Sequence, residues 1–387
     1  MEFVADARLV IHNAGFDFGF LNFELERCTR ERIPYMWLSH GVPINYHGLA
    51  DFRIAHAELL DDLLTKHLAS LMAAHVVNVE DIIVDGTKVA ASAGKSSYRR
   101  APSLAKLETA AKERIAALKA EVEADTTAHS RREAAAKARA ARETQKRVEE
   151  ARRKLAEIEK ERKQRAKTSP KEVADMKEAR ASTSDPEARK MRCADGAVRP
   201  AYNVQMAVTV EHGLITGIKA TDRRQDSGLA GPMIAETERR TGSRVKRLLA
   251  DMGYACEDDI VTLATRADTP VTCYVPLPQE QDDVKPETRK RRERKRAREP
   301  APVKQWRERM TTAEAEAMMR KRGGIERVNG ALKHRGLTRV AVRGLKKVQA
   351  LALWQALAHN FTTGLRLAAE AAARTAATAT VAAAAAA

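Results

Sequence analysis

The stretch from Ser103 to about Lys167 most constrains the fold, because it is rich in Ala, Glu, Lys and Arg and poor in large apolar residues. Such a composition favours helices and cannot form a buried sheet. Apolar residues recur at helical spacing in one seam and then in a thinner one: Leu104, Leu107, Ala111, Ile115, Leu118 and Val122, then Val148, Leu155 and Ile158. Between the seams, Asp125–Ser130 contains poor helix formers. The pattern predicts two helices in an antiparallel hairpin, whose charged surface either faces solvent or contacts DNA.

Sheet-type patterns lie on both sides of this helical stretch. Val79–Ser92 is short and β-branched, which predicts a strand. Ala201–Val210 and Gly213–Asp222 predict two paired strands with a short turn between them. A fourth strand is expected within Arg244–Ala255, ending near Asp251, and a fifth within Thr269–Leu277. The chain therefore returns to a sheet after the helical insertion.

Helices are expected around these strands. Residues 28–76 are predicted to be helical because a leucine stripe recurs at spacings of three and four: Leu59, Leu60, Leu63, Leu64, Leu68 and Leu71. A helix after Ser227 is expected to break near Gly231–Pro232, and residues 312–333 and 342–368 are predicted helices. The element order is β–β–β–α–β–α–β–α with a helical insert after the first strand. This order predicts an α/β protein with a ribonuclease-H-like sheet.

The charge of the chain indicates its partner. The 387 residues carry a net charge of +17, with a pI of about 9.8, so a polyanion is the first expectation. The four cysteines are far apart without a CxxC pair, which argues against a zinc ribbon or a disulfide framework: Cys28, Cys193, Cys256 and Cys273. No apolar run is long enough to cross a bilayer, and the N-terminus lacks a signal-peptide pattern. We expect an intracellular, nucleic-acid-binding protein without membrane contact.

Three carboxylates lie where predicted elements could bring them together. Asp85 is expected at the end of the first strand, followed by Gly86, and Asp251 at the end of the fourth; Glu326 lies on a late helix. Phosphoryl transfer needs carboxylates that converge from separate elements, because two Mg²⁺ ions take hard oxygen ligands. Taken singly, each acid is more often a turn or solvated residue. Asp195, Asp222 and Asp226 are competitors, and Asp226 is alternatively a cap of the following helix.

Basic residues accompany these acids. Arg322 and Glu326 are four residues apart and share a helix face, with Lys333 near the same face. The alternative is a surface Arg–Glu pair worth at most about 1 kcal/mol. The run Arg289–Arg298 either follows a DNA backbone or is a charged linker. Trp306 is equally suited to stacking on a flipped base and to packing, whereas His334 and His359 are expected to be structural.

The motifs DGTKVAA, LLADMGY and Arg322-x₃-Glu326-x₆-Lys333 together resemble the three acidic motifs of bacterial insertion-sequence DDE transposases. Arg343–Asn360 and Tyr35–Leu64 are similar to the C-terminal helix and the N-terminal helical region of the group numbered eleven-eighty-two. The resemblance implies a metal-binding catalytic triad of Asp85, Asp251 and Glu326, with Mg²⁺ or Mn²⁺ as cofactor. It also implies that Arg322 and Lys333 contact phosphates at the transposon ends. One departure is Met319, which stands where the signature has a tyrosine.

A second resemblance lies at the front of the chain. Leu9–Arg27 is similar to the second motif of the proofreading exonuclease subunit of bacterial DNA polymerase III, where Asp17 would bind metal. The other motifs of that family are missing, so we interpret residues 1–27 as a fused remnant without exonuclease activity.

The expected organisation follows from these motifs. Its segments are an exonuclease-like remnant (1–27), an N-terminal helical region (28–78), the first part of a ribonuclease-H-like catalytic domain (79–102), a helical hairpin or coiled-coil insertion (103–180), the rest of the catalytic domain (181–367) and an Ala-rich tail (368–387).

The expected function is a DDE transposase that binds double-stranded terminal inverted repeats as a homodimer and performs metal-dependent cleavage and strand transfer. Its expected place is the bacterial cytoplasm, at the nucleoid. The DNA-contacting residues are expected to be Arg322, Lys333, Arg289, Lys290, Arg291 and Arg292. The alternatives are a catalytically inactive DNA-binding remnant and a non-enzymatic basic coiled-coil protein that binds nucleic acid by charge alone.

Overall fold

The computed structural model describes residue 52 and residues 55–75, 77–124, 128–168, 179–278 and 286–386. The remnant predicted at 1–27 and the first part of the predicted helical region lie outside these residues. The chain divides into two compact units. The sheet unit comprises Met1–Thr87, Asn203–Thr338 and Lys346–Ala387, and the hairpin unit comprises Lys88–Tyr202 and Arg339–Leu345.

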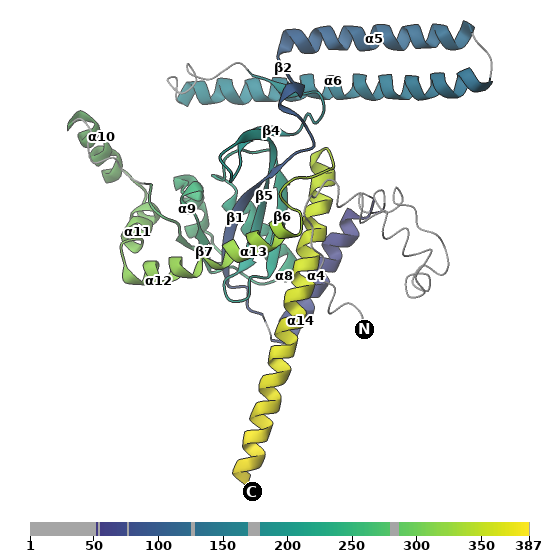
Figure 1. Ribbon diagram of the computed structural model, residues 1–387. Coiled ribbons are helices and arrows are strands. Elements are labelled where there is room, and N and C mark those ends of the chain that lie inside the picture. Colours follow the sequence, from purple (N-terminus) through teal and green to yellow (C-terminus); the bar gives the residue numbers. More distant parts are fainter. Residues whose placement is uncertain are drawn as a thin grey trace. The chain divides into compact units, whose positions relative to one another are not determined.

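The sheet has the strand order β6–β5–β1–β7–β8 (Figure 1). The strands span Asp81–Ala90 (β1), Val198–Thr209 (β5), Ile215–Thr221 (β6), Arg247–Ala250 (β7) and Thr272–Tyr274 (β8). Strands β5 and β6 are antiparallel, whereas β1 pairs parallel with β7 and β7 parallel with β8. This mixed sheet is consistent with the predicted α/β, ribonuclease-H-like arrangement.

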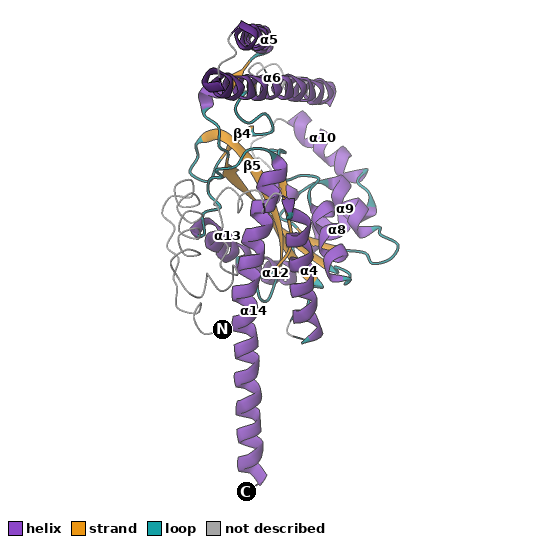
Figure 2. Cartoon of the chain, turned by 90° about the vertical axis from the view of Figure 1, so that its right-hand side faces the viewer, coloured by secondary structure: helices purple, strands orange, loops and turns teal. Residues whose placement is uncertain are grey.

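Helices of the sheet unit follow from amphipathic patterns in the sequence. They are α4 (Ala57–Ala73), α8 (Ala230–Thr241), α9 (Glu257–Ala264), α10 (Pro286–Ala297), α11 (Ala301–Arg309), α12 (Ala313–Lys321) and α13 (Gly324–His334), followed by α14 (Leu345–Ala386). Helix α8 packs on β6, and α4 packs on α8 (Figure 2). Within the part of the chain that the structure describes, no helix combines the length and apolarity needed to span a bilayer.

The core lies between one face of the sheet and helices α8, α9 and α11. Ile82 and Val84 of β1 point into it together with Leu248 of β7. Trp306 is 1% exposed, and its indole nitrogen donates to the carbonyl of Val275 at 2.9 Å. Trp306 is therefore a packing residue, and the alternative of base stacking is wrong. Since side chains alternate along a strand, Ile83 and Asp85 lie on the opposite face.

Helix α14 protects the free edge of β6. Asn360 accepts from the backbone nitrogen of Ile215 and donates to its carbonyl, each at 2.8 Å. Gln349 makes the same pair of contacts with Ala220 and Ile218, at 2.7 and 3.0 Å. These amides satisfy edge groups that would otherwise pair with another strand.

The hairpin unit contains the two helices predicted from composition, α5 (Ala101–Ala124) and α6 (Ala128–Thr168) (Figure 1). Leu104, near the start of α5, packs with Val148 and Leu155 in the second half of α6, so the helices are antiparallel. Leu107, predicted in the same seam, is 39% exposed. Short strands accompany the helices: β2 (Tyr98–Arg99) pairs with β3 (Ala181–Ser182), and β4 (Arg189–Arg192) pairs with Val198–Ala201.

Several element boundaries differ from the predictions. Gly231–Pro232 does not break α8, because both residues lie in its first turn, where proline is tolerated. The helix predicted over 312–333 is two helices, which meet at Arg322 and Gly323. Of the leucine stripe, Leu59 and Leu63 are exposed at 43% and 37%, and the other four are buried.

Candidate active site

The register of β1 and β7 sets Asp85 beside Asp251. The last residue pair of this parallel ladder is Val84 with Ala250. The next residues on the two chains are Asp85 and Asp251, and neighbouring strands lie about 4.8 Å apart. The prediction that Asp85 ends its strand is wrong, because β1 continues to Ala90 after β7 has stopped. The carboxylates meet because β7 ends there.

Asp85 is held by two donors. Its Oδ1 accepts from the backbone nitrogen of Gly86 at 2.8 Å, and its Oδ2 accepts from Nδ2 of Asn329 at 2.8 Å. The residue is 9% exposed. The pKa of Asp85 is raised to about 6, first by burial and also by the nearby charges of Asp251 and Glu326, against the opposing effects of the Gly86 hydrogen bond and Arg322. The site therefore disfavours a second negative charge unless a cation is present.

Asp251 is more open than Asp85. It caps the short 3-10 turn Met252–Tyr254, and its Oδ1 accepts from the backbone nitrogen of Gly253 at 2.8 Å. Tyr254 is buried at the end of this turn and donates its hydroxyl proton to Oε1 of Gln205. Burial, with the nearby charges of Asp226, Asp85 and Asp251, raises the pKa of Tyr254. Tyr254 therefore stays a neutral donor within reach of the acids.

A polar cluster not predicted from the sequence supports this pair. Asn203 and Gln205 of β5 donate to Oδ1 of Asp226 at 2.7 and 2.8 Å. The alternative prediction that Asp226 caps α8 is wrong. The cap residue is Leu229, and no side chain caps that end of the helix. The available signal was the pair of amides two residues apart on an otherwise apolar strand, which places both on one face. Asp195, another competitor, pairs with Arg199 in the hairpin unit.

Gly86 is required by this cluster. A Cβ at position 86 would lie 2.2 Å from Nε2 of Gln205 and 2.6 Å from Oδ1 of Asp226. The close approach at Gly86 is therefore with protein side chains.

Helix α13 supplies the third acid. Arg322 caps the end of α12, and its Nη2 lies 3.8 Å from Oε1 of Glu326. The Glu326 side chain is 63% exposed. At about 100° per residue, Glu326, Asn329 and Lys333 form one stripe along α13. Asn329 is 5% exposed, and its Oδ1 has no hydrogen-bond partner among the described residues. A buried acceptor without a donor is costly, so this oxygen would be stabilised by a further polar or charged partner beside Asp85.

The donor chemistry of the site fits a hard divalent cation. Asp85, Asp251 and the free oxygen of Asn329 are the oxygen ligands that Mg²⁺ prefers. Within the described ranges, however, no three His, Cys, Asp or Glu side chains are gathered as a ligand set. Glu326 accounts for this, because it faces solvent and its ion-pair partner is Arg322.

The remaining predicted DNA contacts lie elsewhere in the sheet unit. Arg289, Lys290, Arg291 and Arg292 are on the helix α10. Arg289 pairs with Glu293 at 3.4 Å.

Comparison with known families agrees with this arrangement. Residues 169–361 match the family model described as "Transposase DDE domain". The match supports a DDE transposase, and it includes Asp251 and Glu326 while Asp85 precedes it. No curated protein and no solved structure matches the chain.

Proposed function

We propose that this protein is a DDE transposase that binds the terminal inverted repeats of an insertion sequence as a homodimer and performs metal-dependent DNA cleavage and strand transfer. The observation that carries the proposal is the β1–β7 register, which brings Asp85 beside Asp251 under the helix that bears Glu326. The family match supports the class, and the register supports the chemistry.

Asp85, Asp251 and Glu326 would hold Mg²⁺ or Mn²⁺. Such ions supply a more acidic water and neutralise charge on the phosphoryl oxygens. Gly86 and Asn329 fix both oxygens of Asp85, which leaves each oxygen a further lone pair for a ligand. Glu326 would join the site by rotating its exposed side chain away from Arg322. The Arg322 guanidinium, together with Lys333, would then be available to a DNA phosphate.

A second candidate is an end-binding protein that does not cleave. It is favoured by the outward position of Glu326 and by Met319, half-buried on α12, which replaces the tyrosine of the signature. This candidate retains specific DNA binding and predicts no nicking in any metal.

The test is a Mg²⁺-dependent cleavage assay on a duplex that carries the end of the source element, with Asp251→Asn and Glu326→Gln in parallel. We expect nicking by the parent and a loss of at least about 100-fold in both variants, because metal charge stabilisation contributes several kcal/mol. Asp195→Asn, an acid of the hairpin unit, is the matched control and should cleave like the parent.

The other outcomes are distinct. A parent that binds ends specifically without nicking supports the inactive candidate. Binding without preference for ends supports the basic scaffold, and nicking that survives both substitutions shows that the acids are wrongly assigned.

A further inference from the structure

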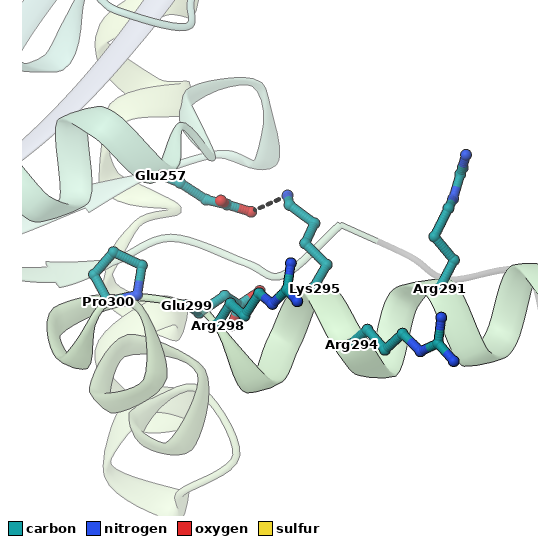
Figure 3. Close-up of a pocket in the computed structure, with 7 residues that line it drawn as sticks. All are labelled: Glu257, Arg291, Arg294, Lys295, Arg298, Glu299 and Pro300. Carbon is teal, nitrogen blue, oxygen red and sulfur yellow. Dashed lines mark hydrogen bonds and ion pairs between the residues drawn. The ribbon is translucent and has the colours of Figure 1, made fainter.

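A basic cleft lies between α9, α10 and the start of α11 (Figure 3). Its volume is about 410 Å³. The residues that line it come from α9, from one side of α10 and from the segment that follows α10: Glu257, Arg291, Arg294, Lys295, Arg298, Glu299 and Pro300. We call it the arginine cleft, after Arg291, Arg294 and Arg298.

Helical spacing explains why only these arginines line the cleft. Arg291, Arg294 and Arg298 are related as i, i+3 and i+7, which places them on one face at about 100° per residue. Arg289, Arg292 and Arg296 have the same spacing and lie on the opposite face. The basic run of the sequence is thus two arginine triplets of equal charge, and one of them faces the cleft.

The two acids of the arginine cleft already have cationic partners. Glu257 of α9 and Lys295 of α10 point toward each other, with their charged atoms 2.7 Å apart (Figure 3). The side chain of Glu299 is only 3% exposed, and its two carboxylate oxygens accept hydrogen bonds from Arg307 at 2.8 and 2.9 Å. Within the described ranges, no carboxylate is paired with Arg291, Arg294 or Arg298. The side of α10 that faces the arginine cleft therefore carries positive charge that no described carboxylate balances.

We propose that the arginine cleft binds a backbone phosphate of DNA. The proposal rests on the proposed function. The sequence predicted a DNA-backbone contact for the whole run Arg289–Arg298, and the proposal assigns that contact to one face of α10. Guanidinium groups bind phosphate through paired hydrogen bonds, and a phosphodiester offers two unesterified oxygens to such groups. DNA is the source favoured here, because the chain carries a net charge of +17 and matches a transposase domain.

The first experiment compares the two triplets in the full chain. One variant carries Arg291→Gln, Arg294→Gln and Arg298→Gln; its matched control carries Arg289→Gln, Arg292→Gln and Arg296→Gln. Both remove the same charge from one exposed helix. Binding of a duplex that carries the source-element end is measured from about 50 to 300 mM salt, a range over which the loss of phosphate contacts lowers affinity measurably. The slope of log affinity against log salt should fall by about 0.9 in the cleft variant, since one phosphate contact contributes about that much.

The control should lose less than half of that slope. Equal losses in the two variants would overturn the proposal and leave α10 as a general electrostatic surface. No loss in either would exclude α10 from DNA contact. A parent that does not bind DNA would overturn the proposed function as well, so the two failures are distinguishable. Thermal unfolding of all three proteins should be similar, because five of the six substituted residues are exposed and Arg292 is half-buried.

A second experiment identifies the ligand group. Neutral methylphosphonates are placed one at a time along the duplex, and affinity is measured for parent, cleft variant and control. We expect one or two positions that weaken the parent and the control but leave the cleft variant unchanged, as coupled partners should. Inorganic phosphate should compete only at concentrations far above those of the duplex. If every position weakens all three proteins equally, no backbone phosphate occupies the cleft.

Discussion

The two halves of the candidate active site are built differently. The sheet half consists of Asp85 and Asp251 with the polar cluster of Asn203, Gln205, Asp226 and Tyr254 behind them, and most of its polar atoms are buried and hydrogen-bonded. The helix half consists of Arg322, Glu326 and Lys333; Glu326 faces solvent in a long ion pair with Arg322, and the two basic residues are half-buried.

This difference shows which parts of the site depend on a ligand. Backbone register fixes Asp85 and Asp251 before any cation or DNA arrives. Glu326 has only an exposed ion pair to hold it, and such pairs contribute about 1 kcal/mol or less. Substitutions in the sheet half should therefore alter folding and metal affinity, whereas a substitution of the Glu326 carboxylate should alter activity alone.

Gly86→Ala should have the largest effect on stability. The added methyl would approach three polar atoms of Gln205, Asp226 and Asn203 at 2.2 to 2.8 Å, so the cluster must shift. We expect a loss of about 3 kcal/mol in the free energy of unfolding, the upper part of the range for overpacked cores. Denaturant unfolding monitored by circular dichroism measures it.

Gly330→Ala is the matched change in the helix half. Gly330 lies inside α13 with nothing within 4 Å of an added Cβ. Alanine there should stabilise the protein by about 0.5–1 kcal/mol, because glycine is a poor helix residue. If both glycines behave alike, the contrast between a packed and an open half is wrong.

Asn329→Leu should have the next largest effect, on metal affinity. The substitution keeps the number of side-chain heavy atoms and their branching, and it removes the amide that donates to Asp85. Loss of such a support typically weakens metal binding by about 10–100-fold. Titration with Mn²⁺, followed by electron paramagnetic resonance, measures the affinity without DNA or turnover.

Asn360→Leu provides the control for that prediction. Asn360 is an equally buried helix asparagine, but it bonds the edge strand β6 and not an acid. It should lower stability and leave Mn²⁺ affinity unchanged. A reversed pattern, with affinity lost only in Asn360→Leu, would remove Asn329 from the site.

Local patterns predicted the strands and the hairpin well. β-Branched runs identified β1, β5 and β6, and the Ala-rich charged stretch indicated α5 and α6. Asp251 was placed correctly after β7 because the apolar run stops there. These features depend on neighbours in sequence, which a single chain displays.

The supporting residues depend on contacts between distant segments. Asp85 meets Asn329 across a sequence separation of 244, and no local pattern records that contact. The register that sets Asp85 beside Asp251 likewise depends on how β1 and β7 pair, which the sequence of either strand alone does not determine. The junction of α12 and α13 had a local signal in Gly323–Gly324, which the predicted continuous helix overlooked.

A last pair of substitutions distinguishes Asp85 from Glu326 by the pH dependence of stability. Folding raises the pKa of Asp85 from 3.8 to about 6, so the folded state binds a proton more tightly than the unfolded state. Its contribution to the free energy of unfolding is therefore present at low pH and falls as pH rises from about 4 to 6. Above that range the buried carboxylate opposes folding by about 3 kcal/mol. Asp85→Asn should recover about 1–2 kcal/mol of this at pH 8, since the Asn329 amide can turn to accept from the new amide.

Glu326→Gln should change stability by less than about 0.5 kcal/mol at any pH, because its carboxylate is exposed. Urea unfolding in EDTA at pH 5 and pH 8 resolves both variants without bound metal. We expect the gain of Asp85→Asn to vanish at pH 5, and both variants to be inactive in cleavage. A gain that persists at pH 5 would show that the stabilisation comes from packing. An effect of Glu326→Gln as large as that of Asp85→Asn would mean that the helix half is as firmly built as the sheet half.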